Sequence, residues 1–148
     1  IGVLVVLALA GDDITATARE SETYALLLFS TTGVMVLAGT DDLLVLATGY
    51  LLASIPLYGL IGLSRSGQAA EAAVKTYLIG ALFGITLLLG VTVLYGISGA
   101  TRYNDLAAQL RGAPVAVVVT GVVAVVAGLM FEAGGVPGHF WVPDATQG

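Results

Sequence analysis

Hydrophobic and polar positions divide the chain into long apolar runs separated by short polar stretches. An α-helix needs about 20 residues to cross the roughly 30 Å hydrocarbon core of a bilayer. Runs near or above this length predict four membrane-spanning helices, over residues 23–39, 43–63, 71–98 and 114–132. Because the loops between these runs are short, consecutive helices are expected to be antiparallel. The pattern therefore predicts an all-α, polytopic transmembrane helix bundle.

The beginning of the chain follows a different pattern. Residues 1–10 are apolar but too short to span, which predicts a partial transmembrane helix. Residues 11–22 carry several acidic side chains and predict an exposed polar loop. No basic segment precedes the first run, so a signal peptide is not expected. Since the chain starts without methionine inside an apolar run, we expect it to be a piece of a longer polytopic protein.

Composition and charge support an integral, multi-pass protein of the cell membrane. Of the 148 residues, 57% are hydrophobic and 10% are charged, whereas soluble domains carry about a quarter of charged residues. A net charge of −5 argues against nucleic-acid binding, which requires a basic surface. The absence of cysteine excludes disulfides and thiolate metal sites.

The last apolar run ends in an unusual way. Glu132 follows the run 115–130, and three glycines and Pro137 occur within the next six residues. Proline removes a backbone donor and clashes with the preceding turn, so the helix is predicted to break between Glu132 and His139. An ionisable group beside such a break inside a membrane indicates a functional site.

Lys75 is the second charged residue within the apolar runs. At a rise of about 1.5 Å per residue, Lys75 lies about 35 Å and Glu132 about 27 Å from the loop that joins their helices. The axial offset of roughly 8 Å is partly within reach of a flexible lysine stem. The spacing therefore predicts a Lys75–Glu132 pair, direct or through water, that relays protons.

Each candidate residue also has a simpler interpretation. Lys75 could extend to the lipid headgroups without a partner. Glu132 could be a neutral carboxyl, because burial disfavours its charged form. His139 titrates near neutral pH and could pass protons, or it could hydrogen-bond a carbonyl that Pro137 or Pro143 leaves free.

The end of the chain carries a motif that is similar to a known family. Phe131 is followed by five residues and then by PGHFWVPDATQG, residues 137–148. This pattern resembles the signature of the antiporter-like membrane subunits of respiratory complex I, of the NADH–quinone oxidoreductase subunit N type. Residues 43–60 and 71–81 look like helices five and six of that family. The resemblance implies that the chain covers family helices three to seven, as part of the first of two inverted repeats.

By this resemblance, residues 23–148 form part of an antiporter-like, proton-transporting membrane domain. Lys75 takes the place of the family's lysine in helix six. Leu51 stands where the family has a glutamate in helix five, and Glu132 where it has a lysine in helix seven. Lys75, Glu132 and His139 are therefore the candidates for a proton relay, and of these Lys75 is the one that matches the family pattern.

Three functions follow as expectations. The first is a proton-translocating membrane subunit of an NADH–quinone oxidoreductase, with other membrane-arm subunits and the lipid bilayer as partners. The second is a subunit of a cation/proton antiporter or membrane-bound hydrogenase of the same fold. The third is a degenerate, structural subunit of the membrane arm. No motif for a nicotinamide, flavin, iron–sulfur or quinone site is present in the sequence, so no cofactor is expected.

Overall fold

The computed structural model describes residues 2–15, 19–64 and 66–147, and these residues contain no β-strand. The helices in chain order are α1 (Gly2–Thr15), α2 (Glu20–Gly39), α3 (Leu43–Ile61), α4 (Gly67–Ser98), α5 (Tyr103–Gln109), η1 (Leu110–Gly112), α6 (Val115–Glu132), η2 (Gly138–Phe140) and α7 (Trp141–Gln147). Four of them, α2, α3, α4 and α6, are long and apolar enough to cross a membrane. The all-α fold and the four predicted spans are therefore confirmed.

Some predicted boundaries were wrong. Within the polar loop expected over residues 11–22, residues 11–15 belong to α1 and residues 20–22 to α2, while residues 16–18 lie outside the described part of the chain. Helix α4 begins at Gly67, where the Ser66 hydroxyl accepts a hydrogen bond from Ala69 N and caps the first turn. The polar stretch after α4 contains the short helix α5 and the 3-10 turn η1.

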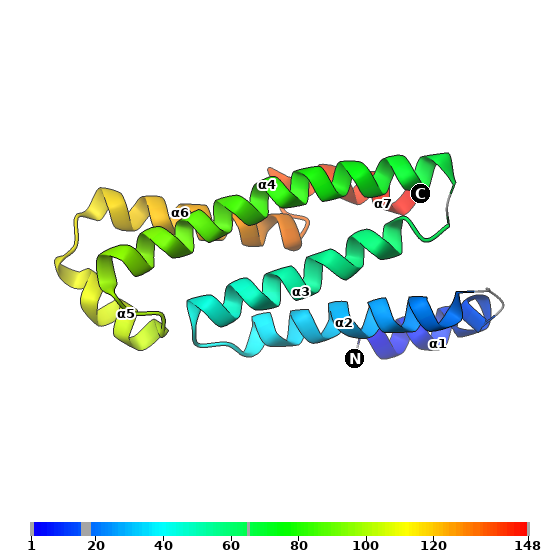
Figure 1. Ribbon diagram of the computed structural model, residues 1–148, viewed down its shortest axis with the longest axis horizontal. Helices are drawn as coiled ribbons and strands as arrows, with labels where there is room; N and C mark the ends of the chain where they lie inside the picture. The colour runs from blue at the N-terminus through cyan, green and yellow to red at the C-terminus, as the bar shows by residue number, and fades with distance from the viewer. Residues whose placement is uncertain (1, 16–18, 65, 148) are drawn as a thin grey trace.

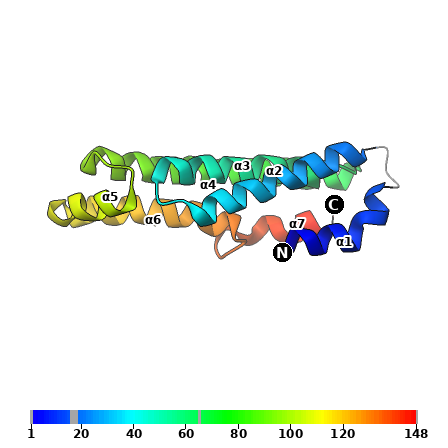
Figure 2. The same cartoon turned by 90° about the horizontal axis from the view of Figure 1, so that it is seen from below.

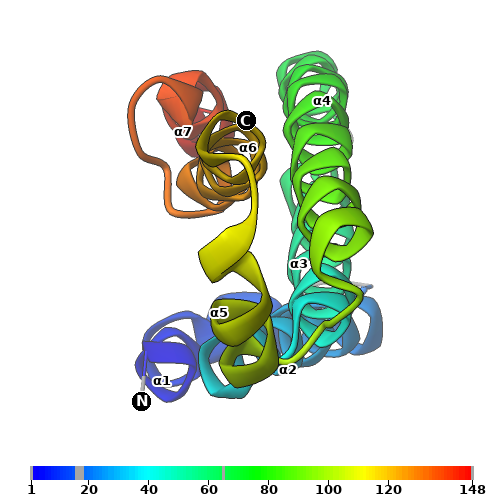
Figure 3. The same cartoon turned by 90° about the vertical axis from the view of Figure 1, so that its left-hand side faces the viewer.

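The four long helices run alternately in opposite directions, as their short connections require (Figure 1). Helix α2 packs on α3, α3 packs on α4, and α4 packs on α6. Seen end-on, α3 and α4 lie one behind the other, and α6 and α7 lie beside them (Figure 3). The core lies between α3, α4 and α6 and includes Tyr50, Leu87 and Val125. Many large apolar side chains on the outer faces of the helices remain exposed, as expected for surfaces that meet lipid or other protein.

Glycines allow two of these helix pairs to approach closely. At Gly33 of α2, an added Cβ would meet backbone atoms of Leu52 and Ala53 on α3. At Gly90 of α4, it would lie 2.7 Å from the carbonyl oxygen of Gly121 on α6. Small residues at such positions replace the hydrophobic driving force that is missing inside a membrane.

A polar cluster ties the α2–α3 turn to the α4–α5 turn at one end of the bundle. Arg102 pairs with Asp41 at 3.1 Å, and the Thr101 hydroxyl donates to Asp42 Oδ2 at 2.5 Å. Asp42 also accepts hydrogen bonds from Leu44 N and Val45 N, so it caps α3. The hydrogen bond from Thr101 holds the pKa of Asp42 below its ordinary value of 3.8, and the two backbone donors lower it further.

The predicted break after α6 is confirmed. Helix α6 ends at Glu132, and the chain returns to helical geometry only at η2 and α7. Figure 2 shows the intervening loop projecting away from the helix axis, with α6 and α7 following one another on the same side of the bundle. Gly134 has a φ of 64°, which residues with a side chain rarely adopt. The backbone N–H of Gly135 donates to Met130 O at 2.7 Å, so the turn satisfies a carbonyl that the helix leaves free.

Candidate functional site

Glu132 places a carboxyl group at the junction of α3, α4 and α6. It is the last residue of α6, and its Oε2 accepts a hydrogen bond from the Ser54 hydroxyl of α3 at 2.6 Å. Ser54 is 1% exposed, and Glu132 is partly buried. This bond joins α6 to α3. The two helices make few other contacts with each other.

Two tyrosines flank Ser54 on the same face of α3. Tyr50 lies one turn before it and Tyr58 one turn after it, and both press against Gly80 of α4. The Tyr50 hydroxyl lies 3.3 Å from Gly80 O, and an added Cβ on Gly80 would lie 2.8 Å from Cζ of Tyr58. Gly80 is thus the point where the aromatic side chains of α3 meet α4.

Aromatic side chains also hold the end of α6 in place. Phe131 is 1% exposed, and its ring stacks on Phe83 of α4 at a centroid distance of 5.4 Å. The ring of Trp141 on α7 packs against the Phe131 ring at a centroid distance of 5.7 Å, and its indole N–H donates to Phe131 O at 3.0 Å. The break therefore has a packed structure, which fixes the position of Glu132 beside it.

The direct form of the predicted Lys75–Glu132 pair is not formed between the described side chains. Lys75 Nζ instead pairs with Glu71 Oε1 at 2.6 Å, one turn earlier on α4, and its side chain is 50% exposed. Glu132 is bonded to Ser54. Each of the two candidate relay groups thus has a different partner in the structure.

His139, the third candidate, lies in η2 beyond the break. Its ring stacks on Phe140 at a centroid distance of 4.7 Å. Nδ1 is buried and has no hydrogen-bond partner among the described residues. Nδ1 therefore does not make the hydrogen bond to a carbonyl freed by Pro137 or Pro143 that was the other interpretation of His139.

Sequence reasoning missed the partner of Glu132. Neither Ser54 nor the two tyrosines was predicted to contact Glu132. The available signal was the position of Ser54, two residues before Pro56 in a largely apolar helix. What could not be read from the sequence is that α6 faces α3 at this level.

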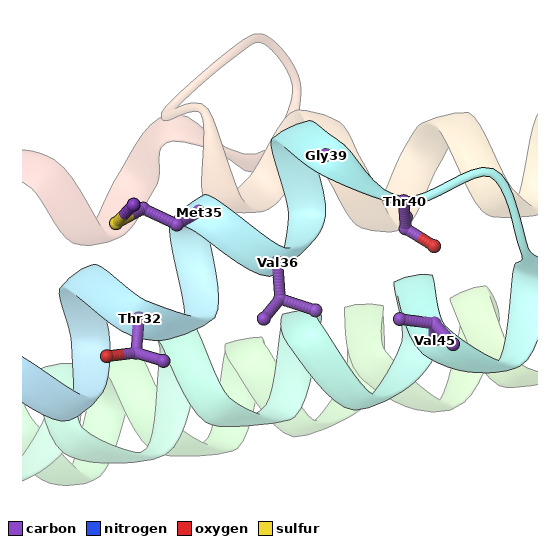
Figure 4. Close-up of a pocket in the computed structure, with 6 residues that line it drawn as sticks. All are labelled: Thr32, Met35, Val36, Gly39, Thr40 and Val45. Atoms are coloured by element: carbon purple, nitrogen blue, oxygen red, sulfur yellow. The ribbon is translucent and has the colours of Figure 1, made fainter.

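Two hollows in the described structure differ in their relation to this site. One, of about 220 Å³, lies between α3 and α4 and is lined by Tyr50, Ser54, Tyr58 and Tyr77 together with apolar residues. A larger one, of about 560 Å³, lies where α2 ends and α3 begins (Figure 4), and it is lined by Thr32, Met35, Val36, Gly39, Thr40 and Val45. No titratable side chain lines the second hollow, so it provides no group for proton transfer.

No group of three histidine, aspartate or glutamate side chains among the described residues is arranged to hold a metal ion. The chemistry that this arrangement can perform is the uptake and release of a proton at a carboxyl group. That group is held by a hydroxyl donor at the end of a membrane helix.

Comparison with known proteins connects this arrangement to a family. Residues 40–148 match the family described as "NADH:quinone oxidoreductase/Mrp antiporter, TM". A protein named NADH-quinone oxidoreductase subunit N, from Mycobacterium sp. (strain JLS), is 68% identical over 147 residues, which are 99% of this chain and 31% of that protein. Subunit N 1 from Streptomyces griseus subsp. griseus is 46% identical over the whole chain and 31% of its own length. The chain thus spans about a third of the length of these relatives.

Solved structures show the same arrangement of helices. A chain of respiratory complex I from Thermus thermophilus with bound Aureothin superposes with a TM-score of 0.76 at 35% identity, over 99% of this chain and 33% of that one. A chain of the membrane-bound sulfane sulfur reductase, an archaeal respiratory membrane complex, superposes with a TM-score of 0.78 at 30% identity, over 82% of this chain and 25% of that one.

Proposed function

Because this chain belongs to the transmembrane family of NADH:quinone oxidoreductase and Mrp antiporter subunits, we propose that it is part of a subunit N that translocates protons in an NADH–quinone oxidoreductase. The relatives at 68% and 46% identity both carry the name of that subunit. In this proposal the partners are the other membrane-arm subunits and the surrounding lipid. The chain itself carries no redox step.

The observation that carries the proposal is the position of Glu132. Its carboxyl group ends a membrane helix at a structured break and is held by one buried hydroxyl, that of Ser54. Ionisable groups are costly inside a membrane and mark proton or ion pathways. We propose that Glu132 binds a proton during translocation and releases it to the next group of the path.

Lys75 and His139 are further relay candidates in the same proposal. Lys75 has a carboxylate partner, Glu71, whose attraction for the ammonium group would change when either of the two gains or loses a proton. His139 has a buried Nδ1 without a partner among the described residues, which leaves that nitrogen able to accept or donate a proton.

The test uses the full-length subunit in its assembled complex, in inverted membrane vesicles. NADH oxidation and the quenching of a pH-sensitive dye are measured side by side, which separates electron transfer from proton translocation. Glu132→Gln is expected to reduce proton translocation per NADH oxidised, while Glu20→Gln, the same change at an exposed position of α2, leaves it unchanged. If Glu132→Gln assembles and pumps like the parent protein, Glu132 is not a proton carrier. That result would support the interpretation of the chain as part of a degenerate, structural subunit of the membrane arm.

A second candidate function is supported by the family description and by the sulfane sulfur reductase chain. Both connect the same fold to complexes other than NADH–quinone oxidoreductases. In that case the subunit serves cation/proton exchange. Vesicles would then show exchange driven by a sodium gradient, and acidification would not depend on NADH and quinone.

A further inference from the structure

The Ser54 hydroxyl group lies within hydrogen-bond distance of two acceptors. Its Oγ is 2.8 Å from the carbonyl oxygen of Tyr50, one turn earlier on α3, and 2.6 Å from Oε2 of Glu132 on α6. A serine hydroxyl carries one hydrogen and two lone pairs. It can therefore donate to only one of these two oxygens at a time.

The protonation of Glu132 decides which oxygen receives the hydrogen. When Glu132 is ionised it can only accept, so the hydroxyl hydrogen must point to Oε2, and the contact with Tyr50 O is no longer a hydrogen bond. When Glu132 is protonated, its O–H can donate to Ser54 Oγ, and the hydroxyl hydrogen is free to turn to Tyr50 O. Both short contacts are hydrogen bonds only in the second arrangement.

Burial leaves the hydroxyl few other partners. Ser54 is 1% exposed, and the only other side-chain groups that interact with its hydroxyl among the described residues are the phenol groups of Tyr50 and Tyr58, one turn away on either side. Two residues later, Pro56 has no N–H, so the carbonyl of residue 52 loses its usual helical donor. One backbone hydrogen bond of α3 is thus missing close to the residue that holds Glu132.

We infer that Ser54 is a positioning residue for the proton carried by Glu132, because its single hydroxyl hydrogen must turn between Glu132 and the Tyr50 carbonyl each time the carboxyl gains or loses a proton. This inference rests on the proposed function. The carboxyl takes up one proton and later releases it, whereas Ser54 keeps its own hydrogen throughout and only rotates. The rotation keeps Glu132 hydrogen-bonded to α3 in both states, so the carboxyl stays in place during the cycle.

A spectroscopic signature tests the inference in the full-length subunit of the assembled complex. Infrared difference spectra recorded on acidification contain the carbonyl band of protonated Glu132, which is assigned by its loss in Glu132→Gln. Ser54→Ala removes the hydrogen-bond partner, so this band is expected to move to higher frequency and proton translocation to fall. Ser54→Thr keeps a hydroxyl at the same position and is expected to restore both. Ser54→Cys, with a weaker hydrogen-bonding group of similar shape, should give an intermediate band if the alanine variant does not assemble.

The matched control is Ser30→Ala. Ser30 also donates to a carbonyl of α3, that of Ala53 at 3.1 Å, but it makes no contact with Glu132. Its removal is expected to leave the Glu132 band in place. The inference is wrong if Ser54→Ala, or Ser54→Cys in its place, leaves the band unmoved, or moves it without changing proton translocation. Normal pumping by Glu132→Gln would instead overturn the proposed function, so the two failures can be told apart.

Discussion

Replacing Gly33 with alanine should separate α2 from α3. Gly33 is buried, and a Cβ built on it would lie 2.5 Å from the carbonyl carbon of Leu52 and 2.6 Å from Cα of Ala53. Both atoms belong to the backbone of α3, which cannot turn aside as a flexible side chain would. Ordinary van der Waals contact begins at 3.4 Å, and the backbone nitrogen of Ala53 lies closer still, so the two helices must part by at least about 0.9 Å at this point.

The cost of that separation can be estimated from the contacts beside Gly33. Overpacking of a well-packed site costs about 1–3 kcal/mol. The hydrogen bond from Ser30 to Ala53 O, 3.1 Å long in the structure, would be stretched to about 4 Å and lost, and such bonds inside membranes contribute about 0.6 kcal/mol. Alanine favours a helix over glycine by about 1 kcal/mol, which offsets part of this cost. The net destabilisation is therefore about 0.5–2.5 kcal/mol.

The assay compares Gly33→Ala with Gly39→Ala in the full-length subunit. Gly39 lies on the same helix, and an added Cβ there has no heavy atom within 4 Å. Samples in detergent are heated in steps, and the fraction that remains monodisperse is measured by size-exclusion chromatography. Gly33→Ala should lose its native peak at a lower temperature than the parent, whereas Gly39→Ala should match or exceed the parent. Equal melting of the two variants would refute the direct backbone contact between α2 and α3.

Three further outcomes follow from the structure. Gly90→Ala should lower the same melting temperature, because its Cβ would lie 2.7 Å from a carbonyl oxygen of α6, while Gly96→Ala, which has open space around it, should not. Trp141→Phe keeps an aromatic ring but loses the indole hydrogen bond to the end of α6, so limited proteolysis should cut between α6 and α7 faster than in the parent. The folded pKa of Asp42 lies below its unfolded value, so its stabilisation is complete above about pH 3.8 and is lost as the pH falls through the folded pKa. The melting temperature of Asp42→Asn should therefore fall less than that of the parent when the pH is lowered from neutral to below 3.8.

The spans and the break could be predicted because membrane physics restricts them strongly. The hydrocarbon core demands a minimum apolar length and satisfied backbone groups, and Pro137 with its neighbouring glycines cannot continue a regular helix. A hydropathy pattern identifies apolar spans, but it does not show where polar residues outside the membrane form helical hydrogen bonds. Helix α1 therefore extends to Thr15 through polar residues, and α5 forms within a stretch expected to be a loop. Leu106 explains α5, since this side chain packs into the core cluster between the spanning helices.

The position of Glu132 along its helix could also be predicted, but the direction of its side chain could not. Helical rise places residues along the axis, whereas contact also depends on the angle around it, about 100° per residue. On α4, Lys75 and Gly84 are nine residues apart and so lie on opposite faces. Gly84 faces Tyr50 of α3, with 3.1 Å between its built Cβ and the ring, so Lys75 points away from α3.

The two directions explain why the charged pair is not formed. Glu132 turns toward α3, where the Ser54 hydroxyl meets it at 2.6 Å, while Lys75 turns outward and meets Glu71 at the same distance on its own helix. An axial offset that favours contact is therefore outweighed by the angle between the two side chains. An ammonium partner would hold Glu132 ionised through a strong, permanent attraction. A hydroxyl partner can both donate and accept, so it can hydrogen-bond the ionised carboxyl and the protonated carboxyl in turn, which is the property that a site must have if a proton is to bind and leave.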